Sequence, residues 1–197
     1  LGFVLLGRCR ATGRWLVWAH AWAHRIVLER RKEVAPALLD FAADGDLTLV
    51  DRPGDDVEAV ADILCEVRDM GLMPEKAAIG VDAAGIGDIV DELLKEERGF
   101  ALENIMGISQ GWRLTGAIKT VERKVAGGEL VHGGRRLMAW CVGNAKTVPM
   151  GNAIGITKQV SGSAKIDPLM ALFDAASLMA LNPAATAGRS FWDREPA

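Results

Sequence analysis

The segment KIDPLMALFDAASLMALNP, residues 165–183, constrains the fold more than any other part of the chain. Its apolar residues cover nearly every face of a helix instead of a single stripe, so a helix here must be buried on almost all sides. An Asp at the N-cap followed by a Pro is a favoured helix opening, and Asp167 and Pro168 stand in that order. The sequence therefore predicts a buried helix that starts at Asp167, stops before Pro183 and carries a carboxylate at its entrance.

The order of the other elements predicts an α/β fold, with a mixed central sheet of about five or more strands and helices on both of its faces. Branched and aromatic residues predict strands at 1–8, 14–22, 46–50, 76–82 and 103–109, and the first two read as a hairpin with a turn at Gly13. Apolar residues at helical spacing predict helices that end near Ala43 and that cover about residues 56–70, the stretch after Asp82, and about 114–125. We expect a further helix within 135–145 and a hairpin or irregular segment within 146–158.

Size and composition indicate one soluble domain. The chain has 197 residues, of which 50% are hydrophobic and 25% are charged, so it can bury a sizeable core. Cys9, Cys65 and Cys141 are far apart and show no CxxC spacing, which argues against a disulfide framework or a zinc site and favours a reducing compartment. No run is apolar enough for a signal peptide or a membrane span, so we expect a cytoplasmic protein without a membrane partner.

Charge is distributed unevenly along the chain, although the formal net charge is only −3. Residues 1–32 carry seven basic side chains and one acidic one, and residues 110–166 carry nine basic and two acidic ones. Residues 33–109 carry 19 acidic side chains and five basic ones. Such segregation suggests a basic surface for a polyanion, although a solvated basic surface without a partner fits the sequence equally well.

Asp82 and Asp167 stand where α/β folds place functional groups, at the end of a strand and at the start of a helix. Each has a structural alternative, since Asp82 suits a turn or an N-cap and Asp167 suits the N-cap of the last helix. In the functional alternative, both carboxylates converge to hold hard divalent cations, which prefer oxygen ligands. A metal pair would relieve the repulsion between the carboxylates and activate water for attack on a phosphate.

Four segments together resemble the C-terminal nuclease domain of tailed-phage terminase large subunits. They are AAIGVDAAGIGDIVDELL, ISQGWRLTGAIKTVERKVAGGELVHGG, LMAWCVGNA and KIDPLMALFDAASLMALNP, in this order. The resemblance covers about residues 1–182, which we expect to form a ribonuclease H-like nuclease domain of three layers, and it leaves 183–197 as a flexible tail. Gln110, Trp112 and Asn144 lie within these segments, but the sequence assigns them no chemistry.

The resemblance implies that acidic residues from the first strand, the end of the fourth strand and the start of the last helix bind two Mg2+ or Mn2+ ions. Asp82 matches the second of these acids and Asp167 matches the third. Residues 1–9 contain no carboxylate, so we expect the first acid to precede Leu1 and the chain as it stands to bind metal weakly and cut poorly. A GxxxxGK[ST] phosphate loop does not occur in the sequence, so we expect the ATPase domain of such proteins to lie outside it.

Three further side chains are candidates for accessory roles around these acids. Asp174 lies seven residues after Asp167 and returns to about the same helix face, although a surface or hydrogen-bonded role is the simpler interpretation. Lys165 could neutralise charge on a phosphate or be a plain surface lysine, and His132 could contact DNA or metal or serve its glycine-rich turn. The basic residues that we expect to contact DNA are Arg113, Lys119, Arg123, Lys124, Arg135, Arg136, Lys146 and Lys158.

The resemblance thus implies a metal-dependent endonuclease that cuts double-stranded concatemeric phage DNA during genome packaging in the host-cell cytoplasm. A small terminase subunit and a portal would be its partners. Three alternatives stay open: another ribonuclease H-like nuclease such as a resolvase or an integrase-like enzyme, a non-catalytic module that docks DNA or a partner, and a small-molecule enzyme that binds phosphate through DAAGIGD. The last fits least, because its glycine spacing matches neither the dinucleotide nor the P-loop pattern.

Overall fold

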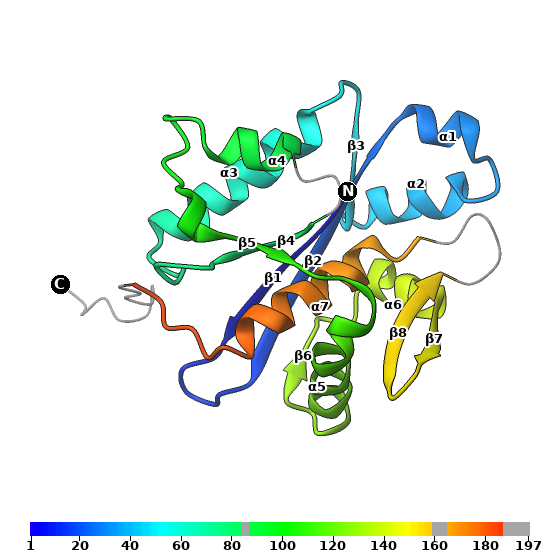
Figure 1. Cartoon of the computed structure of the whole chain (residues 1–197). Coiled ribbons are helices and arrows are strands. Elements are labelled where there is room, and N and C mark those ends of the chain that lie inside the picture. Colours follow the sequence, from blue (N-terminus) through cyan, green and yellow to red (C-terminus); the bar gives the residue numbers. More distant parts are fainter. Residues whose placement is uncertain (84–86, 159–164, 187–197) are drawn as a thin grey trace.

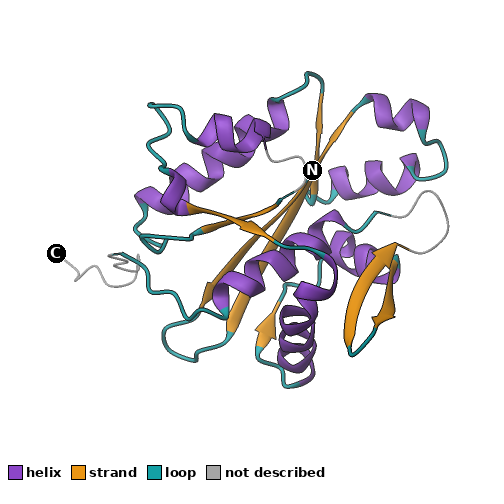
Figure 2. Cartoon of the chain, viewed as in Figure 1, coloured by secondary structure: helices purple, strands orange, loops and turns teal. Residues whose placement is uncertain are grey.

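The computed structural model describes residues 1–83, 87–158 and 165–186, in which strands and helices are interleaved (Figure 1 and Figure 2). The strands are β1 (Gly2–Arg8), β2 (Trp15–His24), β3 (Leu47–Val50), β4 (Ile79–Asp82), β5 (Ile105–Ile108), β6 (Leu130–Val131), β7 (Ala145–Met150) and β8 (Ala153–Lys158). The helices are α1 (Ile26–Arg30), α2 (Ala35–Ala43), α3 (Asp55–Asp69), α4 (Gly87–Leu93), α5 (Thr115–Ala126), α6 (Arg136–Gly143) and α7 (Asp167–Met179), with 3-10 helices η1 (Leu102–Asn104) and η2 (Gly111–Leu114).

The described strands form three separate sheets. β1 pairs antiparallel with β2, whose other edge pairs parallel with β3 and with β6. β4 and β5 form a parallel pair, and β7 and β8 form an antiparallel hairpin. The predicted α/β class, the mixed sheet and the hairpin of β1 and β2 are confirmed. The sheet arrangement differs from the expected single sheet of five or more strands, because no described strand joins β1 to β4.

β1 and β4 nevertheless present the same two faces to the helices around them. Val4 of β1 packs in the core that surrounds α7, whereas Phe3 packs in a second core built on α3. Gly80 of β4 lies against Leu178 of α7, whereas Ile79 belongs to the second core. Because side chains alternate along a strand, α7 covers one face of both strands and α3 covers the other.

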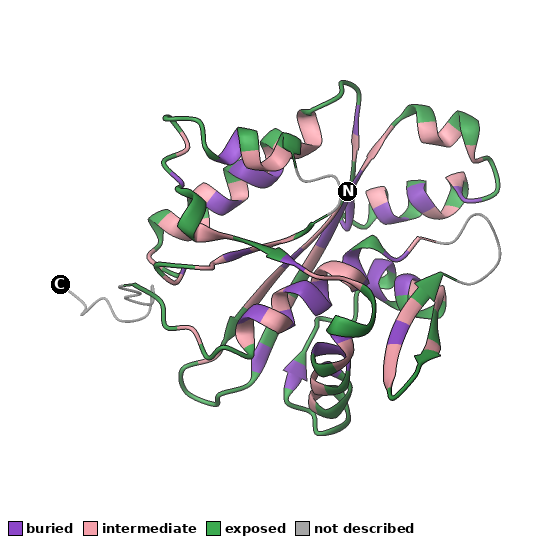
Figure 3. Cartoon of the chain, in the orientation of Figure 1, coloured by how far each residue is buried: buried purple, intermediate pink, exposed green. Residues whose placement is uncertain are grey.

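α7 lies in the middle of the molecule, where Figure 3 shows much of it buried. It packs against β1, β2, β4, α5 and α6, as the buried-helix prediction requires. Its start at Asp167 is confirmed, but the expected N-cap is wrong: the N-cap is Ile166, which makes no side-chain cap, and Asp167 is the first helical residue. Although α7 is apolar, no helix in the described ranges is long and apolar enough to cross a bilayer.

The residues that follow α7 return to the body of the protein. Ala185 forms an isolated antiparallel bridge with Pro74, and the amide of Thr186 donates to the carbonyl of Met73 at 3.0 Å. Arg8 also donates to the carbonyl of Pro183 at 3.0 Å. The beginning of the predicted flexible tail is therefore held in place, and residues 187–197 lie outside the described part of the chain.

Gly2 sets how closely β1 approaches the start of α7. A Cβ atom at Gly2 would lie 2.5 Å from the carbonyl carbon of Asp167 and 2.5 Å from the nitrogen of Pro168. Both are backbone atoms, so they cannot move aside as the end of a flexible side chain can. Glycine at this position brings the first residues of β1 directly beside Asp167.

We expect Gly2→Ala to lower the free energy of unfolding by about 1–3 kcal/mol, the usual cost of overpacking. Gly7→Ala on the same strand is the matched control, because a Cβ atom there would meet nothing within 4 Å. Urea denaturation of both variants measures the difference. Equal stability of the two variants would show that β1 does not rest on the start of α7.

Candidate functional site

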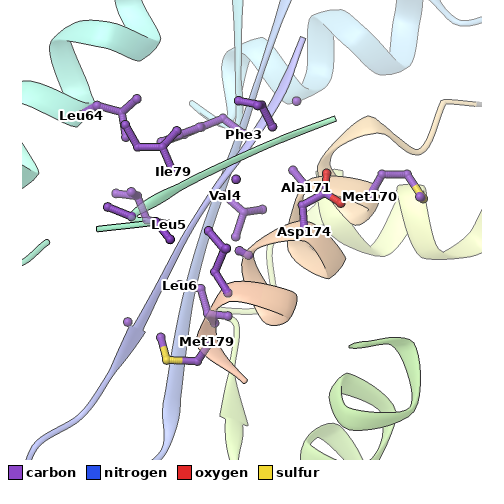
Figure 4. A pocket seen from close by; sticks show the side chains of 18 of the residues that line it. Phe3, Val4, Leu5, Leu6, Leu64, Ile79, Met170, Ala171, Asp174 and Met179 are labelled. Carbon is purple, nitrogen blue, oxygen red and sulfur yellow. The ribbon is translucent and has the colours of Figure 1, made fainter. Parts of the chain in front are cut away.

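A cavity of about 1630 Å3 lies between β1, β4 and α7, and side chains of α3 and α4 close part of its opposite side. Figure 4 shows side chains of β1 between Asp174 of α7 on one side and Leu64 and Ile79 on the other. Much of the lining is apolar, but Asp82, Asp167 and Asp174 all belong to it. The two predicted acids and the accessory candidate therefore face one common space.

Each carboxylate is placed by a regular element. Asp82 is the last residue of β4, opposite Ile108 of β5, and it is exposed. Asp167 is also exposed and starts α7 beside Gly2. Asp174 lies about two turns further along the same helix, where it is buried with 6% of its surface exposed. The cavity thus receives two accessible carboxylates and one that is shielded from water.

Gln110 holds the buried Asp174. Its Nε2 donates to Oδ1 of Asp174 at 2.9 Å and lies 3.3 Å from the carbonyl of Ile108. Burial raises the pKa of Asp174 to about 6, the hydrogen bond from Gln110 opposes this rise, and the nearby charge of Asp82 adds to it. A buried carboxylate coupled to a second carboxylate in a cavity is typical of a functional site.

The start of α7 is also held from the side of α6. Asn144, directly after α6, donates from Nδ2 to the carbonyl of Lys165 at 3.2 Å. Cys141 is fully buried, and its burial together with the charge of Asp167 raises the pKa of the thiol to about 12. Such a thiol stays protonated and is not a nucleophile, so Cys141 contributes packing.

Gln110 and Asn144 are two of the residues to which the sequence assigned no role. Each uses a side-chain amide to fix a segment that bears a candidate acid. The partners of Gln110 and Asn144 are 64 and 21 positions away in the chain, so no local pattern could have assigned these hydrogen bonds. Their position inside the family-like segments was the only available signal.

Lys165 and His132, the other accessory candidates, lie outside the lining of this cavity. Lys165 is half-buried and contributes its carbonyl to the hydrogen bond with Asn144. His132 accepts a hydrogen bond at Nδ1 from the amide of Gly134 at 3.2 Å, and it lines a separate cavity of about 70 Å3. This placement favours the turn role that was the alternative for His132.

Three of the basic residues expected to contact DNA are engaged in ion pairs. Arg136 pairs with Asp44 at 2.6 Å, and Arg135 pairs with the buried Asp46 at 3.2 Å. These guanidinium groups tie the start of α6 to the turn before β3. Lys124 likewise forms an ion pair with Glu129, five residues further along the chain, at 2.7 Å.

The remaining basic candidates are exposed. Lys119 and Arg123 stand four residues apart on α5, and neither has an ion-pair partner within the described residues. Arg113 lies over the exposed indole ring of Trp112, with its guanidinium carbon 5.4 Å from the ring centroid. Lys146 is exposed on β7, and Lys158, at the end of β8, lines the cavity of the carboxylates. Lys158 is therefore the basic candidate that reaches the cavity of the carboxylates.

The three carboxylates are suitable metal ligands, because Mg2+ and Mn2+ prefer oxygen donors. The burial and the negative neighbour that raise the pKa of Asp174 are costs that a bound cation would offset. Over residues 1–83, 87–158 and 165–186, however, no three His, Cys, Asp or Glu side chains are close enough to hold a metal ion. The donor set fits a divalent cation in kind, but its spacing does not by itself complete a site.

Comparison with solved structures places the fold in a known class. The chain is similar to the HK97 bacteriophage large terminase in its crystal structure, with a TM-score of 0.67 and 22% identity over 88% of this chain. It spans 35% of the length of that terminase chain. No protein-family model matches the sequence, and neither does any curated protein. At this identity the likeness establishes a shared fold, which agrees with the resemblance found in the sequence.

We expect Asp174→Asn to stabilise the protein at pH 7 but not at pH 4. Because the folded state raises the pKa of Asp174 from 3.8 to about 6, it binds the proton more tightly than the unfolded chain, and stability falls as the pH rises between these values. Asn removes the buried charge and still accepts from Gln110, so the gain at pH 7 is on the order of 2–3 kcal/mol. Urea denaturation at both pH values measures it, and a difference that does not change with pH would contradict the assignment.

Proposed function

We propose that this chain is the nuclease domain of a phage-type large terminase, with a ribonuclease H-like fold, and that it hydrolyses double-stranded DNA with Mg2+ or Mn2+. The fold shared with the HK97 large terminase supports the class. The observation that carries the proposal is the convergence of Asp82, Asp167 and Asp174 on one cavity, although they come from two separate elements. The charge of Asp82 helps to raise the pKa of Asp174, and carboxylates coupled in this way are common at functional sites.

In such a site, Asp82, Asp167 and Asp174 would have different roles. Bound cations would activate water and stabilise the leaving oxygen of a phosphodiester. Asp82 and Asp167 are exposed, so their oxygens are accessible from the cavity. Asp174 adds a shielded carboxylate that Gln110 holds in place at 2.9 Å. Rigid support of this kind is what metal geometry requires, and the packed helix α7 supplies it for Asp167 and Asp174.

The exposed basic side chains would hold the DNA backbone. Lysine and arginine contacts to phosphate position a duplex without reading its sequence. Lys158 lines the same cavity as the carboxylates, so a phosphate bound there would lie near them. Lys119 and Arg123 offer further charge on α5, which packs directly on α7. Cleavage of concatemeric DNA during packaging, in the host-cell cytoplasm with a small terminase subunit and a portal as partners, is the role that this proposal implies.

The metal assignment predicts that Mn2+ binds the protein and that Asp82→Asn and Asp174→Asn each weaken this binding by about tenfold or more. Isothermal titration calorimetry measures the affinity directly, so changes in stability do not confuse the result. Asp88→Asn is the control, because Asp88 is an exposed residue in the first turn of α4. An unchanged Mn2+ affinity in Asp82→Asn would refute the assignment.

A plasmid-nicking assay separates catalysis from binding. Because residues 1–9 carry no acid, we expect the wild-type chain to nick supercoiled DNA only slowly with Mn2+, and Asp82→Asn to lose this activity while keeping its DNA affinity. If the wild-type protein binds both DNA and Mn2+ but never cuts, a non-catalytic docking module becomes the better interpretation.

DNA binding should depend steeply on salt, because phosphate contacts release counterions. The double variant Lys119→Ala, Arg123→Ala should bind more weakly and lower the slope of log K against log salt by about 2. Lys76→Ala is the control, since Lys76 lies in the acidic part of the chain and is paired with Glu103 at 3.1 Å. Fluorescence anisotropy with one labelled duplex at several salt concentrations gives both quantities. An unchanged slope in the double variant would remove α5 from the DNA interface.

A further inference from the structure

Trp112 presents an exposed indole ring next to the cavity of the carboxylates. It lies in η2 and directly follows Gln110 and Gly111, which both line that cavity. With 58% of its surface exposed, it is the most exposed tryptophan in the described part of the chain. Its neighbours in the chain, residues 109–111 and 113, are polar or glycine. The ring therefore belongs to the surface around the site and not to the core.

The backbone that carries this ring is tied to the rest of the fold. Gly111 has a φ of +70°, which glycine adopts without strain, so the chain can turn sharply after β5. Leu114, at the end of η2, is buried. The hydroxyl of Thr115 lies 2.7 Å from the carbonyl of Trp112 and accepts a hydrogen bond from the amide of Ile154 in β8 at 3.1 Å. Trp112 is thus exposed at a fixed place beside the cavity.

The surroundings of the ring are positively charged. The guanidinium carbon of Arg113 lies over the ring at 5.4 Å from its centroid, within the range of a cation–π contact. Nη1 of Arg113 also donates to the hydroxyl of Ser109 at 3.1 Å, which orients the guanidinium group. Lys158 of β8 adds a second positive charge at the cavity, and β8 packs against η2. A flat ring that carries negative charge suits these groups, and a nucleotide combines both properties.

The ring can stack only on a base that has left its base pair stack. Inside a duplex each base is covered on both faces by its neighbours, so a side chain outside the helix cannot reach a base face. Aromatic side chains do stack on the bases of unpaired strands, and they accept any base because every base has a π face. An exposed indole on a fixed backbone therefore favours an unpaired nucleotide as the ligand.

We infer that Trp112 stacks on an unpaired base of the DNA, next to the phosphate that enters the cavity of the carboxylates. The preferred substrate is then a duplex with an unpaired base beside the cut, and a fully paired duplex binds more weakly. The inference rests on the proposed function, because it takes DNA as the ligand and the cavity as the place of the phosphate. Its test measures binding and needs no cleavage.

Fluorescence anisotropy with two labelled duplexes tests the inference, in a buffer that contains EDTA so that no DNA is cut. The duplexes share the labelled strand, but one is fully paired and the other carries mismatches at its centre. We expect the wild-type protein to bind the mismatched duplex more tightly. Trp112→Ala should lower the affinity for the mismatched duplex about tenfold and that for the paired duplex by less than about twofold. Trp112→Phe keeps an aromatic ring and should retain most of the affinity.

A 2-aminopurine base in the mismatched segment reports the stacking itself, because contact with an aromatic ring quenches its fluorescence. We expect the wild-type protein and Trp112→Phe to quench this base, and Trp112→Ala not to. Leu102→Ala is the matched control: Leu102 is 67% exposed, but it lies in η1, before β5, whereas Trp112 follows β5. This variant should behave like the wild-type protein in both measurements.

The inference is overturned if Trp112→Ala leaves the affinity for the mismatched duplex unchanged or lowers the affinity for both duplexes equally. It is also overturned if Trp112→Ala quenches 2-aminopurine as well as the wild-type protein does. In each of these cases DNA binding by the wild-type protein, and with it the proposed function, still stands. If the wild-type protein bound neither duplex, the proposed function would fail together with the inference.

Discussion

The burial of α7 against one face of both β1 and β4 is the constraint on which the rest of the structure depends. These strands belong to different sheets, and α7 packs on both of them as well as on α5 and α6. Each fully buried Leu or Phe contributes about 1.5–3 kcal/mol of transfer free energy, and α7 buries Leu169, Leu172 and Phe173 in the shared core. A helix held in this way cannot turn about its axis, so Asp167 and Asp174 keep their directions toward the cavity.

The electrostatics of the molecule follow from this packing more than from the order of charges in the sequence. The turn before β3 belongs to the acidic part of the chain, yet Asp44 and Asp46 lie against Arg136 and Arg135 from the basic part. Segregation along the chain is therefore only partly segregation in space. The basic candidates that stay exposed are Arg113, Lys119, Arg123, Lys146 and Lys158, and Lys158 lines the cavity of the carboxylates.

The elements that the sequence predicted correctly are those with a strong local pattern. α3 repeats apolar residues at helical spacing, α7 is a long apolar run that opens with Asp167 and Pro168, and the strands of the first hairpin are rich in branched and aromatic residues. α1 and β6 are too short to show any pattern and were not predicted. The division into separate sheets could not be predicted, because it depends on which strand edges meet across the fold. Of the candidate site, Asp82 and Asp167 were proposed from their positions at element ends and from the family resemblance, and both line the cavity. The burial of Asp174 and its hydrogen bond to Gln110 arise only from tertiary packing, so the sequence could not predict them.

The central claim is that Asp82 of β4 and at least one carboxylate of α7 bind the same divalent cation. Anomalous diffraction from crystals soaked in Mn2+ tests it most directly, because the signal identifies the element and its position at once. The account predicts a Mn2+ peak in the cavity within coordination distance of Asp82 and of Asp174 or Asp167, about 2.0–2.3 Å from their oxygens. Mn2+ bound only elsewhere on the protein, with these carboxylates unchanged, would contradict it.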